Sequence, residues 1–233
     1  MQDHSVVVRP AMKVKPMAGS DRKAWEQRQR RNRIVDKAQA VFFENGYDKT
    51  TLPAIADASG YNKRTLYLYF KDKAELFLAV VLRGLIQLRT EMASATEPTG
   101  SNDSGLRNLA QGFFNFSLHH PEFLDLIMIY ESRHFVYHDH DDADDPHSYR
   151  EQCQQVSADM ARMVTATIEK AMGTGSIRTD LTPHQLMLIL WGQVFGVMKI
   201  LRIRRRHFEN TFGIGRQDLF DHFVDMVERA LHP

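Results

Sequence analysis

Apolar side chains recur every three or four residues along most of the chain, as in Ile34, Ala38, Val41 and Phe42. This spacing places them on one face of an α-helix, whereas a half-buried strand would show strict alternation. No convincing strand pattern occurs in the sequence. The pattern predicts an all-α protein with about nine helices, at residues 24–46, 51–60, 63–69, 72–92, 106–118, 121–132, 149–172, 182–201 and 218–231.

Residues that start and stop helices separate these segments. Gly46 and Gly60 can take the left-handed conformation that ends a helix. Asn62 can cap the short helix that follows it. Asp72, with Glu75 three residues later, forms a capping-box arrangement that predicts the start of a long helix.

Three segments depart from the amphipathic pattern. Residues 1–20 have no apolar period and contain two prolines, so we expect a flexible arm. Residues 94–105 form a polar linker rich in turn residues. The helix predicted at 182–201 is apolar almost all round, so we expect it to be buried on several sides.

The charge of the chain is unevenly distributed. The whole chain has a formal net charge of +1, but residues 1–77 carry 15 basic and 9 acidic side chains, a net charge of +6, which leaves −5 for the rest. A basic N-terminal part on a slightly acidic body suggests that the N-terminal part meets a polyanion. A solvated basic segment is the alternative interpretation.

The segment at 51–70 predicts a helix-turn-helix, because two short helices are joined by a turn that contains Gly60. On a helical wheel Leu66 and Phe70 fall together and can anchor the second helix. Arg64 and Tyr67 face the opposite way. Arginine can pair with guanine in the major groove, while hydroxyls and lysines suit phosphate oxygens.

The sequence TTLPAIADASGYNKRTLYLYFKDKAEL, with its threonine pair and its TLYLYF and KDKAEL motifs, resembles the DNA-binding domain of the TetR family of transcriptional regulators. The detailed resemblance covers residues 28–88 and implies a flexible basic arm at 1–27, a three-helix DNA-binding domain at 28–88 and a ligand-binding and dimerisation domain at 89–233. The sequence departs from the family at position 64, which is often a small residue, and at Tyr61, where a small aliphatic residue is usual. The resemblance implies DNA contacts by Thr50, Thr51, Lys63, Arg64, Thr65, Tyr67, Tyr69 and Lys73.

For the C-terminal part, the resemblance implies a pocket for a small effector and a dimer interface. The last two helices have broad apolar faces, and Gly192 and Gly196 allow close approach of a partner helix. These apolar residues can also serve an intrachain core. The candidates for the pocket, which suit a hydrophobic or amphipathic effector and can each be core residues instead, are Phe113, Phe116, Ile127, Tyr130, Glu131, Met160, Met163, Trp191 and Phe195.

The leading hypothesis is therefore a homodimeric repressor that binds a palindromic DNA operator and is released by a small molecule. The alternative is a metal-responsive regulator that uses the segment 134–147, where histidines and aspartates are frequent. The candidate metal ligands of that segment are His134, His138, His140 and His147.

The residues do not predict an enzyme or a bound cofactor. The sequence contains no glycine-rich phosphate loop after a strand and no HExxH motif. The single cysteine, Cys153, has no recognisable catalytic partner and fits a reducing compartment. No apolar run reaches the roughly 18 to 20 residues of a membrane span, and the N-terminus lacks the apolar region of a signal peptide. We therefore expect a cytoplasmic protein without a membrane partner.

Overall fold

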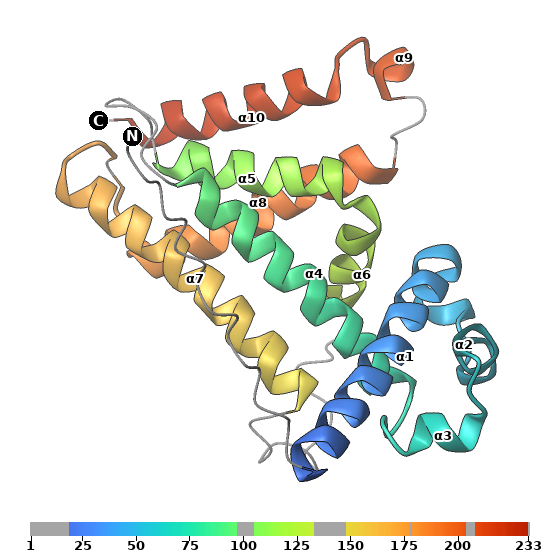
Figure 1. The fold of residues 1–233 in the computed structure, drawn as a ribbon. Helices are drawn as coiled ribbons and strands as arrows, with labels where there is room; N and C mark the ends of the chain where they lie inside the picture. Colours follow the sequence, from blue (N-terminus) through green and yellow to red (C-terminus); the bar gives the residue numbers. More distant parts are fainter. Residues whose placement is uncertain (1–18, 97–104, 133–147, 178, 204–207, 233) are drawn as a thin grey trace, which may run out of the picture.

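The computed structural model describes residues 19–96, 105–132, 148–177, 179–203 and 208–232. These residues form α-helices joined by turns, and the described part of the chain contains no strand. The all-α prediction is confirmed. The helices are α1 (Gly19–Lys49), α2 (Leu52–Ser59), α3 (Lys63–Tyr67), α4 (Lys73–Ala95), α5 (Gly105–His119), α6 (Pro121–Ser132), α7 (Tyr149–Gly173), α8 (Pro183–Ile203), α9 (Phe208–Phe212) and α10 (Arg216–Leu231) (Figure 1).

The helices divide the molecule into a small end and a larger body. Helices α1, α2 and α3 gather at one end, and α4 runs from that end into the body, where α7 lies beside it (Figure 1). Helices α5, α8 and α10 lie at the far end of the body (Figure 1). The domain boundary predicted at residue 88 therefore falls inside the continuous helix α4, and the division into domains stays a prediction.

The predicted caps are present. Asn62 Oδ1 accepts a hydrogen bond from Thr65 N at 2.8 Å, and Asp72 Oδ1 accepts one from Glu75 N at 2.8 Å. Gly60 ends α2 with a φ of 71°. These bonds satisfy amide groups that a helix start would leave without partners. The turn from α2 to α3 and the start of α4 thus follow from local sequence.

One apolar core joins the small end to the body. Its buried side chains run from Ile34 in α1 to Val224 in α10. Helices α4 and α5 approach closely at Gly112, where a Cβ atom would lie 2.9 Å from the backbone of Met92. Because a glycine stands there, the last turns of α4 pack directly on α5.

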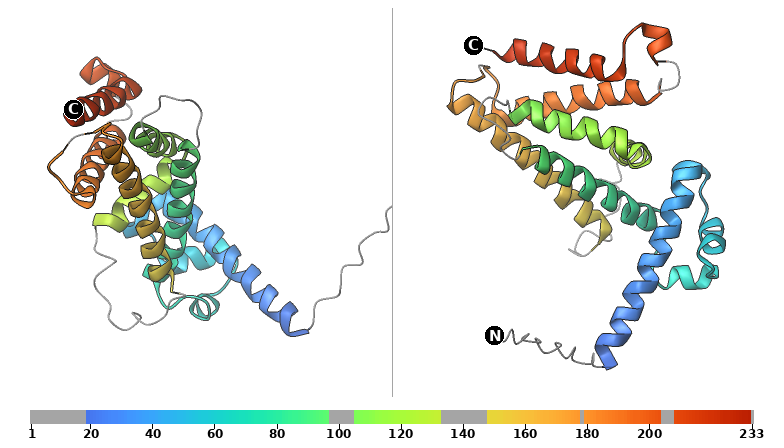
Figure 2. Two further views of the ribbon diagram at one scale, coloured as in Figure 1. Left: turned by 90° about the vertical axis from the view of Figure 1, so that its left-hand side faces the viewer. Right: turned by 45° about the horizontal axis from the view of Figure 1, so that its top comes forward.

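Three features differ from the sequence-based expectation. Helix α1 begins at Gly19, earlier than predicted. Gly46 breaks its helical geometry with a φ of 68°, as the sequence predicted, but a short helical stretch follows the break and extends α1 to Lys49. Helix α9 was not predicted. The N-terminal part of α1 projects away from the other helices (Figure 2), so no tertiary packing marks its start in the sequence.

The expectation that the helix at 182–201 is buried on several sides was wrong for the single chain. In α8 only Leu186, Met187, Met198 and Leu201 are buried. Apolar side chains on its other faces are exposed because α8 packs only on α5 and α7 among the helices with substantial contacts. By length and composition, α8 is also the one described helix that could cross a membrane, and helices of protein cores share those properties.

Candidate DNA interface and ligand cavity

Helix α3 presents a polar arc to solvent and an apolar side to the core. Leu66 and Phe70 are 1% and 3% exposed, as the helical wheel predicted. On the opposite side Arg64 is exposed, and half of Tyr67 is accessible. The Lys63 ammonium lies 5.7 Å from the centre of the Tyr67 ring. The arc therefore combines a guanidinium, a phenol and an ammonium on one short helix.

The two threonines before α2 have different surroundings. Thr51 is exposed, and its hydroxyl accepts a hydrogen bond from Ala54 N at 3.3 Å as the cap of α2. Thr50 is 1% exposed, and its hydroxyl donates to the Gly46 carbonyl at 2.6 Å. A DNA contact by Thr50 would require that hydroxyl to leave the turn between α1 and α2.

Lys73 also has an internal task. Its ammonium donates to the carbonyls of Tyr47 and Thr50, each at 3.0 Å, and lies 4.2 Å from the centre of the Tyr47 ring. Cations favour the negative end of a helix, and Lys73 stands at the C-terminal end of α1. Of the remaining predicted DNA contacts, Thr65 and Tyr69 are half-buried on α3 and in the turn after it.

Arg31 joins the small end of the molecule to the body. Its guanidinium lies between two rings, 5.0 Å from the centre of Phe70 and 4.9 Å from that of Tyr149, and these rings are nearly parallel. It donates to Tyr149 Oη and to Glu75 Oε1, both at 3.1 Å. Tyr149 begins α7, 118 residues after Arg31, so no local pattern in the sequence indicated this contact.

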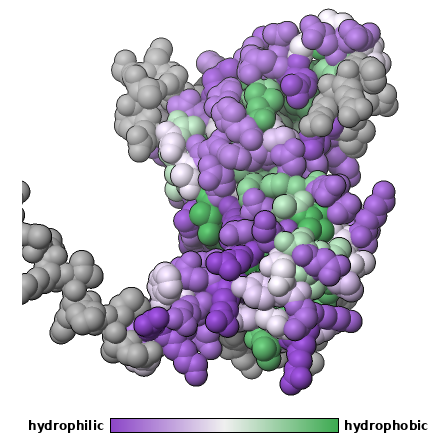
Figure 3. All heavy atoms as spheres, turned by 45° about the vertical axis from the view of Figure 1, so that its right-hand side comes forward, coloured by the Kyte–Doolittle hydropathy of each residue, from purple (hydrophilic) through white to green (hydrophobic). Residues whose placement is uncertain are grey.

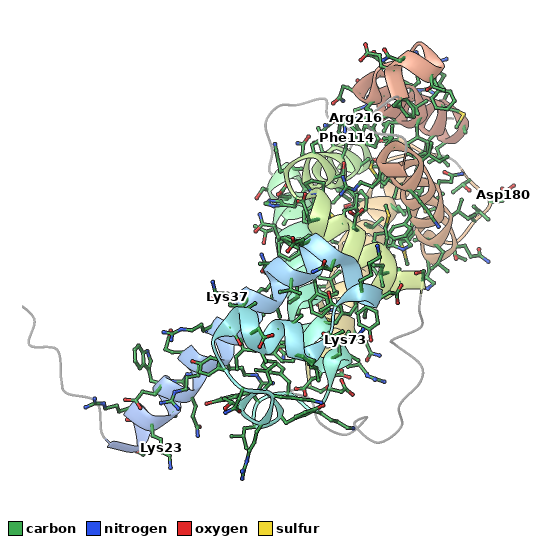
Figure 4. All side chains as sticks on the ribbon, turned by 90° about the vertical axis from the view of Figure 1, so that its right-hand side faces the viewer. Lys23, Lys37, Lys73, Phe114, Asp180 and Arg216 are labelled. Atoms are coloured by element: carbon green, nitrogen blue, oxygen red, sulfur yellow. The ribbon has the colours of Figure 1, made fainter. Side chains whose placement is uncertain are left out.

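The N-terminal half of α1 is basic and largely exposed, and it projects from the other helices (Figure 2). Arg22 pairs with Glu26 one turn away. In the described part of the chain the other cations of this segment have no ion-pair partner, apart from Arg31. Figure 4 shows Lys23 near the tip of α1 and Lys37 further along it, at the end of the molecule opposite Arg216. The cations without an ion-pair partner are Lys23, Arg28, Arg30 and Arg33.

The body contains a cavity of about 830 Å³, lined by residues of α4 to α8 and α10. Four predicted pocket residues line it, namely Phe113, Glu131, Met160 and Trp191. The rings of Phe113 and Trp191 meet edge to face with centres 5.9 Å apart. The five other candidates lie outside the lining: Phe116, Ile127 and Tyr130 are at most 2% exposed in the core, and Met163 and Phe195 pack against it.

The cavity also has polar residues that the sequence analysis missed. Arg107 lies on α5 and forms ion pairs with Glu228 and Asp225 of α10. The distance from its guanidinium nitrogen to the Asp225 Oδ1 atom is 2.5 Å. These carboxylates raise the pKa of Arg107, and the hydrogen bond from the Arg107 guanidinium lowers the pKa of the Asp225 carboxyl. Ser157 has a buried hydroxyl without a hydrogen-bond partner. The sequence signalled neither residue, because both stand at ordinary polar positions of amphipathic helices.

Two buried groups near the cavity stay protonated at neutral pH. Burial raises the pKa of the Cys153 thiol to about 12, and the sulfur lies 3.5 Å from the Leu78 carbonyl. Burial likewise raises the pKa of the Tyr130 phenol. A nucleophilic cysteine must be available as a thiolate, so Cys153 in this setting serves as a core residue.

Helices α8 and α10 carry exposed apolar residues on the outside of the body. Leu188, Ile189 and Ile200 of α8 are between 44% and 55% exposed, and Met226 of α10 is 62% exposed. A Cβ atom added at Gly192 would meet nothing within 4 Å, and the same is true of the next glycine on α8. Figure 3 shows apolar residues reaching the surface in patches on a mostly hydrophilic face.

The histidine- and aspartate-rich segment 134–147, on which the metal-responsive alternative depends, lies outside the described residues. Among the residues that the structure describes, no three His, Cys, Asp or Glu side chains are grouped in a way that could hold a metal ion.

Comparison with known proteins agrees with the helix-turn-helix and with the arrangement of the body. Residues 34–80 match the family model described as bacterial regulatory proteins, tetR family. The transcriptional regulator TtgR of Pseudomonas putida is 25% identical over 75% of this chain and 80% of its own length. The N-terminal helices of the chain therefore form a TetR-type DNA-binding domain.

Other transcriptional regulators match parts of the chain or its fold. The transcriptional activator FasR of Mycolicibacterium smegmatis is 34% identical over 99 residues, 42% of this chain and 45% of FasR, so this chain spans less than half of that relative. The regulator FadR of Bacillus subtilis, solved in complex with stearoyl-CoA, shares the fold with a TM-score of 0.65 and 14% identity, over 86% of this chain and 98% of that one.

Proposed function

We propose that this protein is a homodimeric repressor of the TetR family that binds a two-fold symmetric operator through α2 and α3 and is released by an amphipathic small molecule. The exposed polar arc of α3 carries the proposal. Its side chains have no structural task in the core, whereas Leu66 and Phe70 hold the helix in place. A helix so presented fits the major groove of DNA.

The cations and hydroxyls at this end of the molecule fall into two groups, one placed to read bases and one placed to bind phosphates. Arg64 can pair bidentately with a guanine. Lys63 and Tyr67 beside it, and Thr51 at the start of α2, are placed to meet phosphates. The basic N-terminal half of α1 adds positive charge at the same end of the molecule (Figure 1). Sequence-independent attraction to the duplex follows from that charge.

The apolar outer faces of α8 and α10 support a dimer. An exposed set of large apolar side chains marks an interaction site more often than a free surface. The two glycines on α8, Gly192 and Gly196, leave room for a partner helix. Two copies of α3 must lie about 34 to 36 Å apart, or a multiple of that, to enter successive major grooves.

The cavity supports a small-molecule effector. A largely apolar cavity with a few polar groups is typical of ligand sites. FadR, which shares the fold, was solved with stearoyl-CoA, a molecule with a long apolar chain and a polar head. Helix α4 begins directly after α3, and Met92 and Thr96 at its C-terminal end line the cavity. A ligand that binds better to one spacing of the recognition helices shifts the dimer towards it.

Selection of DNA fragments from a random pool tests the proposal. We expect the selected fragments to share an inverted repeat and to bind a dimer. Sedimentation should give that dimer a mass of twice the 26.9 kDa of one chain. When the selected site is placed between a promoter and the transcription start site, the protein should lower transcription in a purified system. Selection of an asymmetric site, or no enrichment at all, would contradict the proposal.

A further inference from the structure

The cavity is elongated along α7. Ser157 and Lys170 both line it and are 13 residues apart on that helix. At about 1.5 Å per residue the lining therefore extends roughly 20 Å along α7. The walls between these two positions consist mainly of apolar side chains, among them Val164 of α7 and Trp191 of α8. A long apolar molecule fits this space better than a compact one.

The arginine of the cavity is occupied. Arg107 forms ion pairs with both Glu228 and Asp225, which neutralise its charge. An anionic ligand would have to displace a carboxylate to reach it. Lys170, the other strong cation of the lining, is exposed near the C-terminal end of α7. Lys170 lies at the end of the cavity away from Ser157, so near Ser157 the described lining offers a carboxylate or a phosphate no cation without a carboxylate partner.

The opposite end of the cavity has acceptors instead. Glu131, at the end of α6, has no ion-pair partner among the described residues. Its side chain is accessible, yet the surrounding protein raises the pKa of its carboxyl. The hydroxyl of Ser157 is buried and unpartnered. Tyr130 lies near both residues: the Ser157 hydroxyl is close enough to its phenol to lower the phenol's pKa, although it forms no hydrogen bond of ordinary geometry, and the charge of Glu131 raises that pKa. A buried hydroxyl without a partner is unfavourable, and a ligand can relieve that.

We propose that the cavity takes a long apolar molecule with a hydrogen-bond donor, a protonated amine or a hydroxyl, at the end formed by Glu131 and Ser157, and that these two residues bind this donor. The inference rests on the proposed function, in which the cavity receives the effector. A long-chain carboxylate of the same length binds less well, because Glu131 repels it and Arg107 is already paired.

Three probes with the same twelve-carbon chain test the proposal: dodecylamine, 1-dodecanol and dodecanoate, each below its micelle concentration at pH 7. The chain has two tryptophans, so the substitution Trp25→Phe leaves Trp191 of the cavity as the only reporter. Trp191 fluorescence and calorimetry then give the affinities without DNA. We expect the amine and the alcohol to bind at least about tenfold more tightly than the acid.

Two substitutions test the residues. Glu131→Gln should weaken dodecylamine about tenfold and change dodecanol by less than about threefold, because only the amine carries a charge. Ser157→Ala should weaken both about fivefold. Glu169→Gln, the same change at an exposed position of α7 outside the lining, is the matched control and should have no effect. Circular dichroism confirms that each variant is folded.

The proposal is overturned if dodecanoate binds as tightly as the amine, if Glu131→Gln leaves the amine affinity unchanged, or if no probe binds. Operator affinity is measured separately on the same samples. If the amine binds tightly but does not change operator affinity, the effector role of the cavity is contradicted, whereas the proposed ligand class is supported. If the protein without ligand does not bind DNA, the proposed function is contradicted but the proposed ligand class is not.

Discussion

Arg64 and Lys73 are cations at the same end of the molecule, but their surroundings give them different tasks. Arg64 is exposed on α3 and has no partner among the described residues. Lys73 is held by two carbonyls and a ring. The same residue-level resemblance implied DNA contacts for both, so experiments on single residues must separate DNA affinity from folding stability.

Arg64→Ala should weaken binding to the selected operator by about 1 to 3 kcal/mol and relax the preference at one base pair. The reason is the loss of a bidentate pair with a base edge. Fluorescence anisotropy with the operator, with operators altered at each position and with random duplex measures this. Lys63→Ala is the control, and it should weaken all duplexes alike. An equal loss on specific and random duplex for Arg64→Ala would exclude base reading.

Lys73→Met should lower the free energy of unfolding by about 1 to 3 kcal/mol, because two carbonyls lose a charged donor. Methionine keeps the length of the apolar stem and removes the ammonium. Urea unfolding followed by circular dichroism measures the change, with Lys63→Met as the exposed control. Unaltered stability together with weaker binding to every duplex would instead support the phosphate contact that the resemblance implied.

At the scale of elements, α7 meets the DNA-binding end through its first residue. Tyr149 and Phe70 hold the Arg31 guanidinium between their rings, and Glu75 at the start of α4 pairs with it. Helix α7 also lines the cavity from Ser157 onwards. A displacement of α7 therefore acts on α1, on the end of α3 and on α4, in addition to the direct connection through α4.

A double-mutant cycle with Arg31→Met and Tyr149→Leu should give a coupling energy of about 0.5 to 2 kcal/mol in unfolding. The coupling arises because each substitution removes the same ring contact and hydrogen bond. The control combines Arg31→Met with Tyr61→Leu, whose ring is not one of the two that hold the Arg31 guanidinium, and its effects should be additive. Additive effects in the Tyr149 cycle would show that the contact contributes nothing to the joint between α1 and α7.

The elements could be predicted where their cause is local. Asn62 and Asp72 start helices through bonds to amides three residues away, and Gly60 ends one through its own backbone. Features that depend on distant residues were missed. The Arg31 contact joins positions 118 residues apart, and Lys73 bonds to carbonyls 26 and 23 residues earlier. In the sequence, Arg31 and Lys73 cannot be distinguished from the solvated cations of the same basic segment.

The same limit applied to the pocket. Aromatic and methionine residues of α5 to α8 were candidates because of their type alone, and type does not tell a core position from a cavity wall. Phe113 lines the cavity, whereas Phe116 lies three residues later on α5 and is fully buried. Only the packing of α5 against its neighbours separates the two. The unpaired Ser157 hydroxyl has no sequence signal at all.

At the scale of the whole molecule, the outer face of α8 decides the assembly. Gly192→Arg should convert the dimer to monomers, because a long charged side chain occupies the place of a partner helix. The single chain tolerates it, since nothing lies within 4 Å of the added Cβ. Sedimentation measures the mass, and operator affinity should fall at least about 100-fold as one of two linked contacts is lost.

Gly173→Arg is the matched control for this experiment. This glycine, the last residue of α7, also has open space where a Cβ atom would lie, and it is not on α8. It should leave both mass and affinity unchanged. A dimeric Gly192→Arg protein would place the interface elsewhere than on the glycine face of α8.

The buried thiol has a practical consequence for studies of motion. Cys153 is the only cysteine of the chain, it is fully buried beside Leu78 of α4, and burial raises its pKa to about 12. A thiol reagent can reach it only while α7 and α4 are parted. The rate at which a thiol reagent labels the unmodified protein therefore measures how often α4 and α7 separate. A change of that rate on adding ligand or DNA shows whether the two helices are held together more or less tightly.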